Sequence, residues 1–138
     1  MKEEILRFLN SNHEVSLGTL KQGAPYVSAS GSIEHQGKLY LLLSALAQHT
    51  KNLEQDKRAS LLVIENSSAP VHEKKRVSLT GSLEKASSDQ RDALKAEYLK
   101  VFPKSEMFFT LPDFHFYEFK ITEAAWIGGF GKAQTIIW

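Results

Sequence analysis

The spacing of apolar residues along the chain predicts a mainly β domain that opens with a helix. Met1, Ile5, Phe8 and Leu9 recur at helical spacing, so a short amphipathic helix is expected at the start. After Asn12 the period changes to two, which is the pattern of strands with one buried face, and turns rich in glycine and proline separate the segments. The expected strands lie at 14–19, 26–33, 39–43, 59–64 and 76–83, with further strands in the aromatic-rich part from 114 to 138.

One of these segments points to a binding site. The apolar run from Leu39 to Leu43 ends at Ser44 and gives way within five residues to polar residues that can open a helix. The first N–H groups of a helix have no partner inside it and carry partial positive charge, so they favour phosphates and carboxylates. The side chains that would surround such an anion are those of Ser44, Gln48, His49, Thr50 and Lys51.

The order of the elements predicts the architecture. Six or seven strands joined by short turns, with helices that interrupt rather than alternate, argue against a doubly wound parallel sheet. We therefore expect a single domain over 1–138, an antiparallel barrel with peripheral helices. Small barrels fill their interior with side chains, so a ligand must sit outside, at a rim, or between two copies. The aromatic residues near the C-terminus look exposed and favour a site between two copies.

Composition and charge narrow the functional classes. The 138 residues carry a formal net charge of +1, which gives no reason to expect nucleic acid or an anionic membrane as the main partner. The chain contains no cysteine, so disulfides and thiolate metal sites are excluded. Its first residues do not match a signal peptide, and no apolar run approaches the roughly 18 residues of a membrane span. We expect a soluble, cytoplasmic protein.

No catalytic or metal motif stands out. The five histidines do not show the H-x-H, H-x-x-x-H or H-E-x-x-H spacing of local metal sites, so no metal is expected. No serine occurs in G-x-S-x-G, and the catalytic residues stay unknown. Any chemistry is therefore expected to belong to a cofactor that the protein binds and orients.

Several motifs in order carry a family resemblance. The segments VSLGTL, GAPYVS, KLYLLLS, AQHTKNL, RASLLVIEN, RVSLTGSLEKAS, DFHFYEF and WIGGFGKA follow one another between Glu14 and Ala133. In this order they resemble the FMN-binding split-barrel superfamily, typified by pyridoxamine 5'-phosphate oxidase. The motifs HTKNL, DFxFY and GGFGKA are most similar to the heme-utilisation branch of that superfamily.

The resemblance implies a fold and a site. The fold is a six-stranded antiparallel split β-barrel with Greek-key connections, and two copies form a homodimer with a ligand site in each of two clefts. In flavin-binding relatives the FMN phosphate lies against the segment that matches Ser44 to Thr50, with the residue that matches Arg76 near it. Ser28 and Ser30 match the strand that lies under the flavin ring.

This chain departs from the flavin-binding pattern at two positions. Gln48 and His49 stand where those relatives carry an Arg-Lys pair, so a cation would have to come from Lys51, Lys75 or Arg76. In heme-degrading relatives a histidine beyond the glycine motif ligates the iron. The seven residues after Gly131 include no histidine, so a heme would need another histidine as its ligand.

Three functional hypotheses follow. The first is a flavin-dependent oxidoreductase of unknown substrate that binds FMN. The second is a heme-binding or heme-utilisation protein that uses the same cleft between subunits. The third is a ligand-binding barrel without enzymatic activity. Taken alone, the segment from Ser44 to Lys51 also fits a polar loop with a helix cap, and the serine faces also fit strands that face water.

Overall fold

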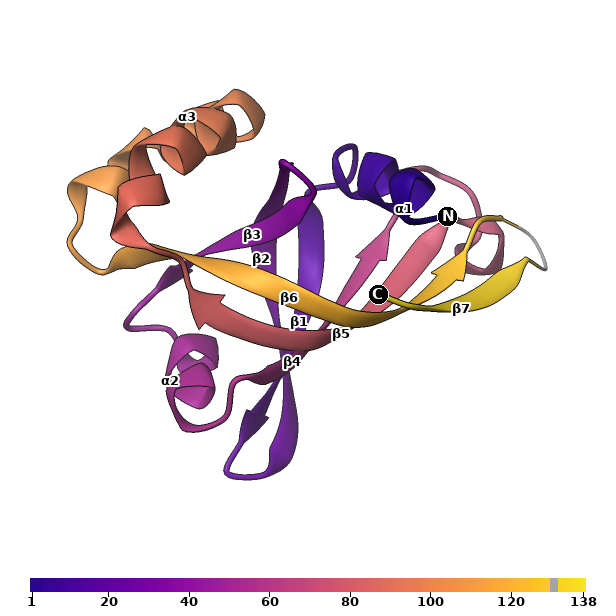
Figure 1. Cartoon of the computed structure of the whole chain (residues 1–138), viewed down its shortest axis with the longest axis horizontal. Coiled ribbons are helices and arrows are strands. Elements are labelled where there is room, and N and C mark those ends of the chain that lie inside the picture. Colours follow the sequence, from indigo (N-terminus) through magenta and orange to yellow (C-terminus); the bar gives the residue numbers. More distant parts are fainter. Residues whose placement is uncertain (130–131) are drawn as a thin grey trace.

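The computed structural model describes residues 1–129 and 132–138 and shows a closed antiparallel barrel of six strands with a seventh strand outside it (Figure 1). The strands are β1 Glu14–Lys21, β2 Ala24–His35, β3 Lys38–Ser44, β4 Arg58–Ile64, β5 Arg76–Lys85, β6 Phe114–Ile127 and β7 Ala133–Ile137. The helices are α1 Lys2–Leu9, α2 Gln48–Gln55 and α3 Arg91–Val101, with 3₁₀ segments η1 Val71–Glu73, η2 Ser88–Gln90 and η3 Pro103–Thr110.

The strand order confirms the predicted Greek key. Neighbours follow the order β3-β2-β1-β4-β5-β6-β7, and pairing of β3 with β6 closes the barrel. Two hairpins join β1, β2 and β3, and β4 returns to lie beside β1, which is the Greek-key arrangement. Both hairpin turns, at Gln22-Gly23 and Gln36-Gly37, have positive φ at their two central residues, as tight hairpins with right-handed twist require.

The alternation expected for β1 and β5 is confirmed by burial. Their inward residues, among them Leu17 and Leu79, lie in the main core together with Ile5 and Leu9 of α1, which covers one end of the barrel. A second core cluster, under α3, is formed by Ile33, Tyr40, Leu42, Leu94, Tyr98 and Phe116. The fold therefore has a filled barrel interior, and any sizeable ligand must lie outside it.

In β2 the serine face is not the one that faces water. Val27 is 72% exposed and Ala29 is exposed as well, whereas Ser28 and Ser30 on the opposite face are half-buried. The reason is the split in the barrel: β2 pairs with β3 only from Ser32 onward, and α2 packs against the earlier part of β2. The serine face therefore turns toward a helix, and the apolar face turns outward.

The aromatics near the C-terminus are buried or half-buried, so the expectation that they are exposed is wrong. Phe116, Phe119 and Trp126 are between 2% and 4% exposed. Trp126 packs edge-on against Phe8 of α1 at 5.0 Å between ring centroids. The expected glycine turn from Gly128 to Lys132 includes residues 130 and 131, which lie outside the described residues.

Candidate functional site

The start of α2 forms an open helix end at the rim of the barrel. No described side chain caps it, because the N-cap residue is Ala47, and the first helical hydrogen bond runs from Lys51 N–H to the Ala47 carbonyl at 3.2 Å. The backbone N–H groups of residues 48–50 therefore lack partners within the helix. This geometry matches the predicted anion-binding helix start.

His49 connects this helix end to β2. Its Nδ1 and the Ser28 hydroxyl form a hydrogen bond of 2.9 Å, which joins two of the predicted site residues. Burial lowers the pKa of His49 below its ordinary value of 6.5, so the ring is neutral at pH 7. With Nδ1 held by Ser28, Nε2 is the ring nitrogen left for another partner.

Gln48 is tied into a buried polar chain. Its Nε2 donates to Asn52 Oδ1 at 2.8 Å, and Asn52 Nδ2 donates to Thr19 Oγ1 at 3.0 Å. Asn52 and Thr19 are both buried. Together with the contact between His49 and Ser28, this chain docks α2 on the hairpin of β1 and β2. Gln48 thus has a structural role and retains one N–H and its carbonyl oxygen for a ligand.

The other predicted site residues of this segment, Ser44, Thr50 and Lys51, differ in whether their polar groups are available to bind a ligand. The Ser44 hydroxyl donates to Asp113 at 3.2 Å and accepts from Leu46 N–H at 3.1 Å, so it shapes the turn into α2. Thr50 is 1% exposed, and its hydroxyl has no hydrogen-bond partner among the described residues. Lys51 is exposed and forms no ion pair with any described residue, so it can supply a cation at this end of α2.

Arg76 lies elsewhere in the same chain. It pairs with Ile127 at one end of β6, whereas Ser44 pairs with Phe114 at the other end of this 14-residue strand. About 40 Å of strand therefore separates the two positions. Within one chain, Arg76 therefore does not approach Ser44.

Local contacts hold the Arg76 side chain. Its Nη1 donates to the carbonyl oxygens of Val71 at 2.9 Å and Lys74 at 3.0 Å. Both acceptors are neutral, so the charge of the guanidinium is not paired by these contacts. Arg76 could reach the start of α2 only in a second copy of the chain.

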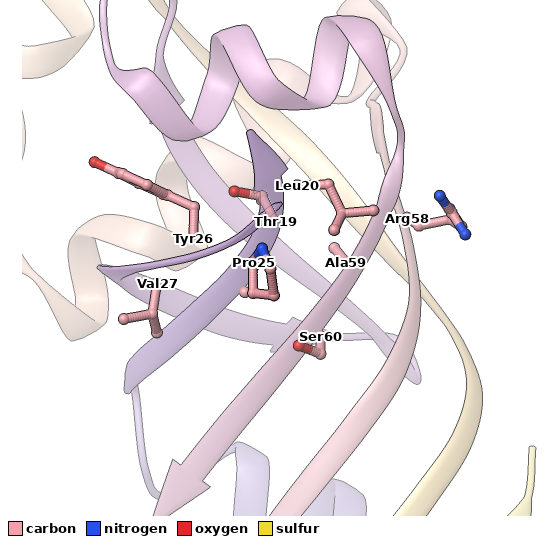
Figure 2. A pocket seen from close by; sticks show the side chains of 9 residues that line it. Thr19, Leu20, Pro25, Tyr26, Val27, Arg58, Ala59 and Ser60 are labelled. Atoms are coloured by element: carbon pink, nitrogen blue, oxygen red, sulfur yellow. The ribbon is translucent and has the colours of Figure 1, made fainter. Parts of the chain in front are cut away.

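A groove of about 540 Å³ lies across β2, β1 and β4 (Figure 2). In Figure 2, Tyr26 and Arg58 point away from each other at its two ends, with Thr19, Leu20 and Pro25 between them. The Thr19 side chain accepts from Asn52 of α2, whereas its neighbour Gly18 and the exposed Val27 line the groove on the outward face of the same hairpin. Sequence reasoning missed Thr19 and Arg58 as site residues, because only the pairing of β1 with β4 brings their strands together.

Ser30 lies in a second groove. This groove of about 520 Å³ runs between the hairpin and the segment of α3 and η3, and three of its lining residues are the aromatics Tyr98, Phe102 and Phe108. The Ser30 hydroxyl donates to the Gly31 carbonyl at 3.1 Å. Ser28 and Ser30 therefore face different neighbours, and only Ser28 contacts α2.

Residues 1–129 and 132–138 contain no group of three or more histidine, aspartate or glutamate side chains placed to hold a metal ion. No helix among them is long and apolar enough to cross a bilayer.

Comparison with known families identifies the barrel. The family described as "CREG, beta-barrel" matches residues 6–137. The chain belongs to the CREG β-barrel family. This family assignment, together with the strand order, confirms the resemblance to the split-barrel superfamily and its six-stranded fold. No curated protein matches the sequence.

Solved structures share this CREG-type barrel. A heme-binding protein from Mycobacterium smegmatis is 26% identical with a TM-score of 0.90, and the match covers 99% of this chain and 57% of that one. ChuZ from Campylobacter jejuni is 23% identical with a TM-score of 0.84, over 99% of this chain and 58% of that one. An FAD-binding protein from Mesorhizobium loti is 17% identical with a TM-score of 0.72, over 90% of each chain. The chain thus spans little more than half of the first two proteins.

The environment of His49 predicts how this CREG-type barrel responds to acid. Because the folded state lowers the pKa of His49, the unfolded chain binds its proton at a higher pH than the folded chain does. The free energy of unfolding should therefore fall as the pH drops from 6.5 through the lower, folded pKa. NMR titration of the His49 ring measures that pKa. Urea unfolding above and below pH 6.5 measures how much of the free energy of unfolding is lost on acidification, and this loss should be smaller in His49→Gln than in the wild type. A His49 pKa at or above 6.5 would contradict the burial of its ring.

Proposed function

We propose that this CREG-type barrel is a homodimer that binds a planar, anionic cofactor between its two copies, with FMN as the first candidate, and that it works as a flavin-dependent oxidoreductase. The observation that carries the proposal is the open start of α2, joined to β2 by the bond between His49 and Ser28, with a large groove on the outward face of the same part of β2. The start of α2 offers hydrogen-bond donors for a phosphate, and the groove offers a surface for a ring.

The donor set fits the phosphate of FMN. Backbone N–H groups at residues 48–50 and His49 Nε2 would donate to phosphate oxygens, and Lys51 would bring a positive charge. The groove volume of about 540 Å³ lies within the range of roughly 300–1,000 Å³ that small-molecule sites occupy. Bound FMN would supply the electron transfer, while the chain binds and orients it.

The outer surface of the barrel supports the homodimer. One row of paired residues crosses five neighbouring strands at the same height, and every residue in it is exposed and uncharged. A second row beside it is uncharged across four strands and ends at the exposed Glu123 of β6. With strands about 4.8 Å apart, the first row alone is about 20 Å wide. We call these nine residues the outer face: Ala29, Ser16, Leu62, Ser78 and Ala125, then Val27, Gly18, Ser60 and Thr80.

The outer face has the properties of an interface with a second copy of the chain. Depletion of charge is what distinguishes the centre of a protein interface from the rest of a surface, and small side chains let two sheets approach closely. The groove across β2, β1 and β4 is continuous with the outer face, because Gly18, Val27 and Ser60 belong to both. Arg76 precedes Ser78 by two residues on β5, so both side chains are on the same face of the sheet, and Arg76 lies at the border of the outer face. A two-fold axis through the face would let Arg76 of the partner subunit approach the start of α2.

Heme is the second candidate because the His49 ring is neutral and has one nitrogen free to bind iron. The ring is neutral, and Ser28 fixes Nδ1, which leaves Nε2 as the free nitrogen; this is the state in which histidine ligates iron. The M. smegmatis relative, at 26% identity over almost the whole chain, is a heme-binding protein. A neutral His49 also brings less attraction to a phosphate than the Arg-Lys pair of flavin-binding relatives would.

Absorbance titration with FMN and with hemin tests the proposal and separates the two candidates. His49→Ala should weaken FMN binding about tenfold by removing one charge-assisted hydrogen bond, since the backbone donors stay in place. For hemin, the same variant should lose the Soret band of the ligated protein altogether. His35→Ala, at the turn between β2 and β3, is the matched control and should bind as the wild type does. If neither ligand binds the wild type, the proposal is wrong.

A further inference from the structure

A small cavity lies where β5 ends, η2 begins and β6 starts. Its volume is about 60 Å³, and its polar lining is formed by Lys85, Ser87, Ser88, Arg91 and His115. No residue of the α2 site belongs to it. The cavity therefore has its own set of donors, brought together from β5, η2, the start of α3 and β6.

Two of these side chains carry uncompensated positive charge. Neither Lys85 nor Arg91 forms an ion pair with any residue that the structure describes. Arg91 is held in place, because its Nη1 donates to the Phe114 carbonyl at 2.8 Å and its guanidinium lies 5.5 Å from the ring centroid of Phe109. A guanidinium fixed in this way loses little entropy when it binds an anion.

Two nearby carboxylates each accept a hydrogen bond from a serine hydroxyl. The Ser87 hydroxyl donates to Asp89, and the Ser44 hydroxyl donates to Asp113. Burial lowers the pKa of His115, and the charges of Lys85 and Arg91 lower it further. Asp113 and the backbone of Pro112 act in the opposite direction with smaller effect. The positive charges of Lys85 and Arg91 thus act on the His115 ring from the lining of the cavity.

We propose that this cavity binds a phosphate, either as the free ion or as the terminal group of a phosphorylated ligand. Its side chains can donate N–H and O–H bonds from several directions, which suits a tetrahedral oxyanion. Its volume of about 60 Å³ is far below the roughly 300 Å³ at which sites for drug-sized molecules begin, so a flavin or porphyrin ring does not fit. This inference is independent of the cofactor proposed for the α2 site.

NMR titration of the wild-type protein with inorganic phosphate tests the site, with the His115 ring as the reporter. Bound phosphate should raise the pKa of His115, because its negative charge offsets Lys85 and Arg91. By linkage, phosphate should bind more tightly as the pH falls through that pKa. The His49 signal reports separately on the α2 site. A His115 pKa that saturating phosphate leaves unchanged would overturn the proposal.

Variants and related anions sharpen this test. Lys85→Gln should weaken phosphate binding about tenfold, since it removes one charge-assisted contact. Lys38→Gln, which removes an exposed lysine at the start of β3, is the control and should have no effect. Equal weakening in both variants would show unspecific attraction and overturn the site. Glycerol phosphate that matches inorganic phosphate would indicate the terminal group of a larger ligand, and glycerol phosphate that fails to bind would indicate the free ion.

Discussion

Replacing Leu62 with glutamate is expected to convert the protein from a dimer to a monomer. Leu62 lies in the middle of the outer face and is 36% exposed in the single chain, so a glutamate there stays hydrated in a monomer. In the proposed dimer the two new carboxylates would be desolvated within one interface, at a cost of several kcal/mol each. Sedimentation velocity measures the change in mass, and circular dichroism should show that the β structure is kept.

Met107→Glu is the matched control for this experiment. Met107 is 65% exposed and lies on η3, which packs against α3 rather than on the outer face. The same change of an exposed apolar residue to glutamate should therefore leave the dimer intact. A Leu62→Glu protein with the mass of the wild-type dimer would show that the two copies meet elsewhere.

Replacing Gly81 with alanine is expected to destabilise the fold strongly. Gly81 lies at the bulge where β5 changes register against β6. An added Cβ would overlap the carbonyl oxygen of Lys120 and lie 2.9 Å from its carbonyl carbon, so the backbones of two paired strands would have to move apart. We expect a loss of about 3 kcal/mol, the upper part of the range for overpacking, and a melting temperature roughly 10 °C lower.

Gly18→Ala provides the comparison for Gly81→Ala. Its added Cβ would meet the hydroxyl of Ser60, a side chain that can rotate away, rather than backbone. The loss should stay below about 1 kcal/mol when both variants are unfolded in urea at the same protein concentration. Equal losses in the free energy of unfolding would mean that β6 shifts at Lys120 to make room for the added Cβ. The bulge would then not require glycine.

The strand pattern predicted the elements better than it predicted their orientation. Period-two alternation identifies which residues of a strand share a face, and in β1 and β5 the apolar face is also the buried one. From Ala24 to Ile33 both faces of β2 are uncharged, so alternation alone could not show that Val27 faces outward and Ser28 faces α2. The position of α2 decides this, and it depends on contacts between residues far apart in sequence.

The sequence likewise predicted several site residues but not how they lie relative to one another. Ser28 and His49 were both predicted, but the bond between them joins positions 21 residues apart and depends on how α2 docks. Arg76 was predicted to lie near the segment from Ser44 to Thr50, yet its distance from Ser44 depends on which end of its strand it occupies. The cavity at His115 had no signal in the sequence, because its charged residues come from separate elements.

The most direct test of the cofactor site is a titration of FMN and, in parallel, of hemin into the wild-type protein and Leu62→Glu, followed by absorbance. If the cofactor lies between two copies, the wild type should saturate at one ligand per chain with FMN or with hemin. The Leu62→Glu monomer keeps the start of α2 but lacks the partner's side of the cleft, so its binding should be weakened at least tenfold. A folded monomer that binds the same ligand as tightly as the wild type would contradict the site between subunits.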